Sequence, residues 1–261
     1  MIKCHQTSFA NKVYSGLETN VIGKKLYHLN TIDSTNLFIK NMDKKEKQEG
    51  IVVVADVQSK GRGRKDRTWT SPKGGLWFSI LLFPKIHPKQ GMLITMIGSI
   101  AVTQGIIELT DLNPEIKWPN DILLNKQKVC GILTEIEARK DKMNYVILGI
   151  GINVNNILEK KLHKSAITLK DVFGSEVSRE ELLIAILNSF DNNYRKINSE
   201  NYEYIRKLWL SYSNIIGKKI KVEDEKNTYY GIVSDIDEYG HLFLKTNSGQ
   251  VKIISGDVTY L

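Results

Sequence analysis

The chain has 261 residues, of which 41% are hydrophobic and 25% charged, and its formal net charge is +8. This length predicts one large domain with a small appended module, and the apolar content argues against a disordered chain. The lysines are spread along the whole chain, so charge alone does not indicate a nucleic-acid-binding protein. The two cysteines, Cys4 and Cys130, lie far apart in the sequence and suggest neither a disulfide framework nor a Cys-x-x-Cys site. The N-terminus lacks the apolar core of a signal peptide. Both observations favour the reducing cytoplasm.

The first quarter of the chain predicts two strands and the start of a helix. From Leu26 to about Leu37 we expect a short strand, a turn and a helix start, with Asp33 or Ser34 as the N-cap. Ile51 to Val57 has the sequence IVVVADV, and a run of β-branched residues is typical of a buried strand. A basic, glycine-rich loop follows this strand directly.

A second buried strand and a long helix come next. Leu76 to Phe83 (LWFSILLF) predicts the strand, which Pro84 ends because proline cannot donate a hydrogen bond to the sheet. Apolar residues at helical spacing predict a core-facing helix from Gln90 to Leu109. Its longest near-apolar stretch, Met92 to Val102, is too short to cross a bilayer, so no membrane segment is expected.

The middle of the chain predicts three more strands and two helices. The strands are expected at Asp121 to Leu124, Val129 to Glu137 and Tyr145 to Val154. The turns between them are short, which implies antiparallel pairing. Ser178 and Glu181 form a capping-box pattern that opens a helix through about Tyr194, and a shorter helix is expected from about Glu200 to Tyr212. Strands and helices are segregated more than alternated, which favours an α+β fold.

After Gly217 the pattern changes to four short strand-like runs, KIKVED, TYYGIVSDID, HLFLKT and QVKIIS, separated by glycine, asparagine and charged residues. Such runs predict a small all-β barrel of SH3-like size. We therefore expect an N-terminal extension over residues 1–25, a main domain over residues 26–214 and an SH3-like module over residues 215–261.

The familiar nucleotide and catalytic motifs do not fit this sequence. Gly61 to Asp66 begins like a dinucleotide fingerprint, but its sixth position is Asp66 and it leads into a strand. No Walker A loop, Gly-x-Ser-x-Gly elbow or His-Glu-x-x-His site occurs. Any nucleotide chemistry must therefore use another arrangement.

Four segments remain as candidates for chemistry, each with a structural alternative. The loop from Gly61 to Gly75 offers glycine amides and arginines for an anion, or it is a solvated hairpin. Lys117 to Asp121 (KWPND) offers an acid for Mg²⁺ and an amide for phosphate, or it is a tight turn. Lys128, at a strand entrance, could meet a developing negative charge, although lysines in turns usually face solvent. Gly149 to Asn153 ends a strand in small residues, where Asn153 could contact a nucleotide or the glycines could simply relieve a sheet crossing.

Taken together, these segments resemble the biotin protein ligase family. Their order and approximate spacing match the family over Leu26 to about Val154, and the chain after Gly217 resembles the family's SH3-like domain. The matching segments are Asp33 to Asn36, Gln58 with Gly61 to Arg64, Lys117 to Asp121, Lys128 to Leu133 and Gly149 to Asn153. The resemblance implies a catalytic domain related in fold to class II aminoacyl-tRNA synthetases.

Carried over residue by residue, the resemblance implies a role for each matched side chain. Biotin would be contacted by Ser34, Thr35, Asn36, Gln58, Arg62, Gly63, Arg64, Lys128 and Gly131. Arg64 and Lys128 would take part in catalysis. The nucleotide would be contacted by Arg67, Trp69, Asn120 and Asn153, and Mg²⁺ by Asp121.

The resemblance further implies the reaction and its partners. Biotin is joined to AMP from ATP with Mg²⁺, and biotin then passes to a lysine of a biotin carboxyl carrier domain, such as that of acetyl-CoA carboxylase. Related enzymes transfer lipoate or octanoate instead, and a nucleic-acid-binding module is a further alternative from the basic loop and small barrel. Only about 25 residues precede the resemblance, so we expect no repressor-type DNA binding and no membrane association, with a monomer or homodimer in the cytoplasm.

Overall fold

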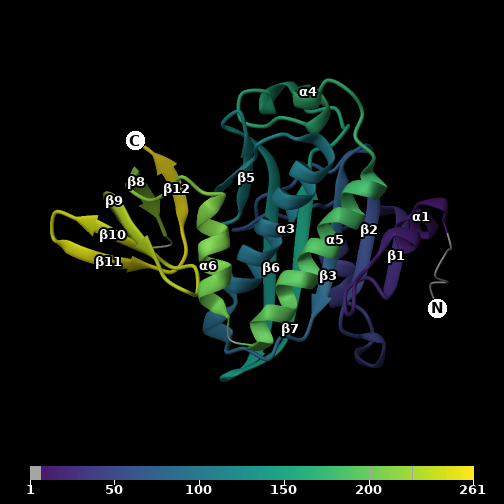
Figure 1. The fold of residues 1–261 in the computed structure, drawn as a ribbon, viewed down its shortest axis with the longest axis horizontal. Coiled ribbons are helices and arrows are strands. Elements are labelled where there is room, and N and C mark those ends of the chain that lie inside the picture. The colour runs from purple at the N-terminus through teal and green to yellow at the C-terminus, as the bar shows by residue number, and fades with distance from the viewer. Residues whose placement is uncertain (1–6, 200, 225) are drawn as a thin grey trace.

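The computed structural model describes residues 7–199, 201–224 and 226–261, which form a mixed seven-stranded sheet packed with helices and a separate five-stranded sheet (Figure 1). The strands of the first sheet are β1 (Lys25–Ile32), β2 (Ile51–Gln58), β3 (Leu76–Leu82), β4 (Glu115–Lys117), β5 (Asp121–Leu124), β6 (Gln127–Arg139) and β7 (Lys142–Ile152). Their spatial order is β1-β2-β3-β7-β6-β5-β4. Only β1 and β2 pair in parallel, and the other neighbours are antiparallel. The expected α+β class is confirmed.

The helices cover the two faces of this sheet unequally. They are α1 (Ser8–Gly16), α2 (Thr35–Lys40), α3 (Met92–Thr110), α4 (Leu169–Phe173), α5 (Arg179–Arg195) and α6 (Tyr202–Ser211), with 3₁₀ turns at Lys44–Glu46, Pro88–Gln90, Lys160–Leu162 and Lys196–Ser199. Figure 1 shows α3 and α5 side by side across one face. Val52 and Val54 of β2 belong to the core beneath them, while Ile51 and Val53 belong to a smaller core on the opposite face with Ile39 of α2. Because both faces are covered, the first five residues of β2 are apolar and buried instead of alternating.

Helix α3 is longer than its apolar sequence stretch suggested, which corrects the expectation that it is too short to cross a bilayer. With its 3₁₀ start it runs over 23 residues, Pro88–Thr110, and its most apolar 18-residue stretch has a mean hydropathy of 1.7, so length does not prevent it from crossing a bilayer. Its most apolar stretch is instead 72% buried inside the protein. It is a core helix that is apolar on nearly every side because it lies between the sheet and other helices.

Several boundaries differ from the sequence-based expectation. Strand β4 was not expected, and the five-stranded sheet contains β12 in addition to the four expected runs. Ser34 is the N-cap of α2 but makes no capping hydrogen bond, and Asp33 instead accepts hydrogen bonds from Ser59 and Lys60. The Ser178 hydroxyl caps α5 by accepting from the Glu181 amide, which is one half of the expected capping box, while the Glu181 carboxylate pairs with Lys12.

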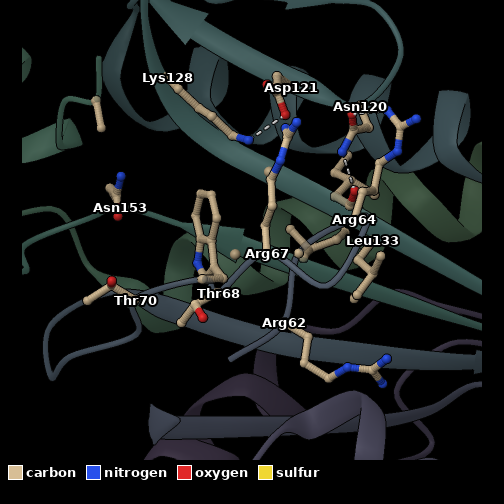
Figure 2. A pocket seen from close by; sticks show the side chains of 18 of the residues that line it. Arg62, Arg64, Arg67, Thr68, Thr70, Asn120, Asp121, Lys128, Leu133 and Asn153 are labelled. Carbon is tan, nitrogen blue, oxygen red and sulfur yellow. Dashed lines mark hydrogen bonds and ion pairs between the residues drawn. The ribbon is translucent and has the colours of Figure 1, made fainter. Parts of the chain in front are cut away.

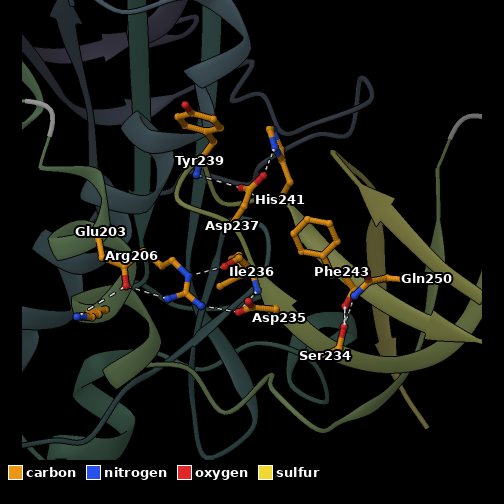
Figure 3. Close-up of polar contacts among 11 residues, drawn as sticks. Glu203, Arg206, Ser234, Asp235, Ile236, Asp237, Tyr239, His241, Phe243 and Gln250 are labelled. Atoms are coloured by element: carbon orange, nitrogen blue, oxygen red, sulfur yellow. Dashed lines mark hydrogen bonds and ion pairs between the residues drawn. The ribbon is translucent and has the colours of Figure 1, made fainter.

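The second sheet contains β8 (Lys219–Glu223), β9 (Thr228–Ile236), β10 (Leu242–Thr246), β11 (Gly249–Ile253) and β12 (Asp257–Tyr260), in the antiparallel order β11-β10-β9-β8-β12. We call it the C-terminal barrel. Arg206 of α6 joins it to the main domain, because its guanidinium donates to the Asp235 carboxylate and the Ile236 carbonyl (Figure 3).

A tight turn at one end of the barrel reaches the main domain a second time. Asp237 organises this turn by accepting from the amides of Tyr239 and His241 and from the His241 ring (Figure 3). The turn places the Gly240 carbonyl 2.9 Å from the indole nitrogen of buried Trp118, which donates to it. The barrel therefore supports the KWPND segment directly.

Candidate functional site

A pocket of about 400 Å³ lies on the sheet face opposite α3 and is bordered by the basic loop, the KWPND segment, residues 156–166 and the C-terminal barrel. Figure 2 shows Lys128, Asp121 and Asn120 along one side of it and Arg62 on the other. Every site residue expected from the sequence lines this one pocket: Ser34, Thr35, Asn36, Gln58, Arg62, Gly63, Arg64, Arg67, Trp69, Asn120, Asp121, Lys128, Gly131 and Asn153. Their individual roles remain predictions.

One end of the pocket consists of neutral hydrogen-bonding groups. Ser34, Thr35 and Asn36 lie at the start of α2, where all three are buried. The Gln58 carbonyl accepts from the Thr35 amide at 2.9 Å and from its hydroxyl at 3.1 Å. The Gln58 amide nitrogen donates to Ser71 at 2.9 Å. These bonds fix the Gln58 amide in a single orientation.

Two further polar residues support this end and were not expected. The buried Ser79 hydroxyl lies 2.6 Å from Thr35 Oγ1 and 2.5 Å from Asn36 Oδ1. Glu135 accepts from Asn36 Nδ2 at 2.7 Å. A signal for Ser79 was present in the sequence, because it is the one polar residue in LWFSILLF and a buried hydroxyl needs a partner.

The pocket floor is made of glycines from β6 and β7. Gly131 and Gly151 are register partners, and the Trp69 indole lies on both, because an added Cβ would stand 2.9 Å from its ring at Gly131 and 2.4 Å from its nitrogen at Gly151. At Gly149 a Cβ would stand 2.3 Å from Asn36 Oδ1. The glycines therefore make room for the side chains that line the pocket.

Trp69 also leaves a polar group available. Its indole nitrogen is buried and has no hydrogen-bond partner among the described residues. A buried donor left without an acceptor costs about 1–3 kcal/mol. An acceptor on a ligand in this pocket would remove that cost.

The other end of the pocket is charged. Lys128 Nζ lies 2.6 Å from Asp121 Oδ1 and 5.0 Å from the centre of the Trp69 ring. The side chains of Lys128 and Asp121 are 31% and 25% exposed, so solvent screens the pair only partly. Neighbouring Cys130 is fully buried, and burial raises the pKa of its thiol, which makes it unsuited to act as a nucleophile.

The basic loop folds back as a short hairpin, and its cations Arg62, Arg64, Lys65 and Arg67 each have an acidic or polar partner. Trp69 N donates to Gly61 O, and Gly63 N donates to Arg67 O. Arg64 donates to Asn120 Oδ1 at 3.1 Å and to the Gly256 carbonyl at 3.2 Å. Burial lowers the pKa of Arg64, but an arginine remains charged at neutral pH.

Asp257 of the C-terminal barrel gathers three of these cations. Its carboxylate lies 2.6 Å from Arg67, 3.3 Å from Lys65 and 3.9 Å from Arg64. Burial raises the pKa of Asp257, but the hydrogen bond from Lys65 and the charges of Arg67 and Lys65 lower it more, so the net pKa is below the ordinary value. This link between the loop and the barrel was not expected from the sequence.

Asn120 and Asn153 stand at the charged end with their side chains already engaged. Asn120 Nδ2 donates to Ile132 O at 2.7 Å. Asn153 is buried, and its Oδ1 accepts from Asn156 at 3.2 Å. Residues 156–166, which border the pocket beyond Asn153, carry no motif in the sequence and were missed.

Comparison with known proteins gives consistent results over both parts of the chain. The family described as "Biotin/lipoate A/B protein ligase family" matches residues 29–153, and the one described as "Biotin protein ligase C terminal domain" matches residues 215–259. The "Bifunctional ligase/repressor BirA" of Bacillus subtilis is 38% identical over 95% of this chain and 78% of its own length.

A second relative and a solved structure agree with these matches. The "Biotin--[acetyl-CoA-carboxylase] ligase" of Paracoccus denitrificans is 27% identical over 80% of this chain and 89% of its own length. The biotin protein ligase of Aquifex aeolicus, solved with biotin and ATP, superposes with a TM-score of 0.80 at 31% identity, covering 91% of this chain and 99% of that one.

Proposed function

Because the chain belongs to the biotin protein ligase family, we propose that it activates biotin with ATP to biotinyl-5′-AMP and transfers the biotin to a lysine of a carboxylase's biotin carboxyl carrier domain. The observation that carries this proposal is the division of the pocket into a neutral polar end and a cationic end. A molecule with a polar ring and a carboxylate tail fits that division.

The neutral end suits the ureido ring of biotin. A cyclic urea presents both donors and acceptors, and each one buried without a partner costs about 1–3 kcal/mol. Ser34, Thr35, Asn36 and Gln58 supply hydroxyl and amide groups of both kinds. Their internal hydrogen bonds hold these groups in place before the ligand arrives.

The cationic end suits the activation step. The biotin carboxylate oxygen attacks the α-phosphorus of ATP, and the bond to pyrophosphate breaks. Two unit charges of like sign at 4 Å repel by about 4 kcal/mol at an effective dielectric of 20. Lys128 and Arg64, which line this end, would offset that repulsion and stabilise the charge that develops in the transition state.

The transfer step needs protection of the intermediate. The carrier lysine amine attacks the acyl carbon of biotinyl-5′-AMP, and AMP leaves. Water would compete for the same carbon, so a loop that covers the mixed anhydride preserves it. Arg62, Gly63 and Arg64 border the pocket from such a loop.

ATP and its metal ion would occupy the side of the pocket near the KWPND segment. Arg67, Trp69, Asn120 and Asn153 line it, and the Trp69 indole nitrogen awaits an acceptor. Among residues 7–199, 201–224 and 226–261 no group of three or more His, Cys, Asp or Glu could hold a metal. A single carboxylate, that of Asp121, is sufficient for a Mg²⁺ ion that arrives on the nucleotide phosphates, since Mg²⁺ in such sites takes one or two carboxylates and keeps its waters. The ion would neutralise phosphate charge.

The chain's partners follow from the same proposal. Burial of α3 supports a protein that does not enter membranes, and an unpaired, buried Cys130 supports the reducing cytoplasm. We expect a monomer or a homodimer.

Biotin-dependent exchange of label between pyrophosphate and ATP tests the activation step. Exchange should require biotin and should be far weaker with lipoate or octanoate at the same concentration. Exchange driven equally well by lipoate or octanoate would contradict the proposal and favour the related acyl ligases.

As a finer test of the loop, Arg64→Gly should release biotinyl-5′-AMP, which then labels lysines of a bystander protein. Retention of the intermediate as tight as in the parent chain would count against a role for Arg64 in holding it.

A further inference from the structure

Glu135 lies where the neutral end of the pocket meets the basic loop. It belongs to β6, on the same face as Gly131 and Leu133, which line the pocket. Its side chain is 22% exposed. Neither a sequence motif nor the chemistry proposed above uses this carboxylate.

Glu135 holds one pocket residue and one loop residue at the same time. Its Oε2 accepts from Asn36 Nδ2 at 2.7 Å, and its Oε1 accepts from Arg62 at 3.1 Å. These two residues come from α2 and from the loop, so the carboxylate joins two separate elements.

The contact with Asn36 decides which way its amide points. An ionised carboxylate only accepts hydrogen bonds, so the amide must turn its nitrogen toward Glu135. The oxygen then faces the Ser79 hydroxyl, which lies 2.5 Å away. Asn36 Oδ1 also lies close to the backbone of Gly149, because a Cβ added there would stand 2.3 Å from it. The donor and acceptor that Asn36 shows to the pocket are therefore set by Glu135.

We propose that Glu135 is a positioning residue for biotin: it fixes the amide of Asn36 for the ureido ring and draws Arg62 over the same end of the pocket. This inference rests on the proposed function. Glu135 reaches the ligand only through Asn36 and Arg62.

The ion pair between Glu135 and Arg62 should contribute little to the stability of the fold, and a glutamine at position 135 can still form a hydrogen bond with Asn36. Arg62 is 40% exposed, and exposed ion pairs contribute little to folding. Loss of the carboxylate should therefore change ligand binding much more than unfolding. That difference separates a positioning role from a merely structural one.

The test compares Glu135→Gln with Glu137→Gln. Glu137 lies two residues along the same strand and face and is exposed, so it is a matched control. A glutamine at position 135 has the same shape, but its amide nitrogen can face Asn36 and turn the Asn36 amide over. We expect the Kd and KM for biotin to rise about 10- to 100-fold, which corresponds to loss of one charge-assisted hydrogen bond. The kcat of exchange should stay within about threefold, and Glu137→Gln should match the parent chain.

A double variant tests the link to the loop. If Glu135 acts partly through Arg62, then Arg62→Gln combined with Glu135→Gln should weaken biotin binding less than the product of the two single effects. Equal biotin affinity in Glu135→Gln and Glu137→Gln would overturn the inference. The inference would also be overturned if Glu135→Gln unfolded at a lower urea concentration and this loss of stability were large enough to explain the weaker biotin binding. Absence of biotin-dependent exchange in the parent chain would instead overturn the proposed function.

Discussion

Replacing Asp257 with asparagine should release the basic loop from the C-terminal barrel. The substitution keeps the size and hydrogen-bonding oxygen of the side chain but removes the charge that Arg64, Lys65 and Arg67 share. The barrel itself should stay folded, because β12 pairs with β8 through backbone groups that the substitution does not touch.

The geometry sets the size of the effect. The three pairs have N–O distances of 2.6, 3.3 and 3.9 Å, and the Asp257 side chain is 29% exposed. Partly exposed pairs each contribute about 0.2–1 kcal/mol. We therefore expect the substitution to destabilise the closed loop, relative to the open loop, by about 1–2 kcal/mol. That loss raises the open fraction of the loop roughly 5- to 30-fold.

Limited proteolysis with trypsin measures this fraction, because trypsin cuts after lysine and arginine and the loop is rich in both. When opening is fast relative to cleavage, the cutting rate follows the open population. In Asp257→Asn the cutting rate at residues 62–67 should rise roughly 5- to 30-fold. High salt screens the ion pairs of the parent chain, so at high salt the parent's cutting rate should rise toward that of the variant. Glu223→Gln is the control, since Glu223 lies opposite Asp257 on β8 and pairs with Lys221. Unchanged cutting in Asp257→Asn would refute the role of the barrel in holding the loop.

Three other predictions concern the pocket and its pH dependence. Lys128→Gln should slow biotin-dependent exchange about 10²- to 10³-fold, measured at saturating biotin; a loss below tenfold would contradict its electrostatic role. Gly149→Ala should displace Asn36, whose Oδ1 would stand 2.3 Å from the new Cβ, and calorimetry should show biotin affinity reduced at least tenfold; parent-like affinity would mean that Asn36 does not contact biotin. Because the pKa of Asp257 is lowered in the folded chain, its stabilising contribution is present above its ordinary pKa of 3.8 and is lost as the pH falls through the lower folded value. The difference in unfolding free energy between the parent and Asp257→Asn should thus be constant above about pH 5 and vanish only in strong acid, and a difference that disappears near neutrality would exclude this assignment.

The sequence predicted the main elements well where local physics decides. The β-branched run of β2, the apolar run of β3 and the capped helix α5 are each specified by neighbouring residues. Strand β4 has three residues, too few for a periodic pattern, and it forms only because β5 lies beside it.

Some residues of the site could likewise be predicted from local sequence patterns, and others could not. Glycines, basic residues and KWPND mark the pocket in the sequence because the chemistry of an anion needs those residue types. Glu135 and Asp257 carry no such mark in the sequence, and they matter through partners that lie far away in the chain, such as Asn36 for Glu135. No local pattern contains such a relationship, and it emerges only from the folded sheet.

The hydrogen bond from Trp118 to the Gly240 carbonyl spans 122 positions of the chain. At a synthesis rate of about 5–20 residues per second, the indole is made roughly 6–24 s before its acceptor. During that interval the KWPND segment lacks the support that it has in the finished protein. A growing chain on the ribosome should therefore acquire a competent nucleotide side of the pocket only after the barrel has emerged, which makes the enzyme's maturation a late and abrupt event.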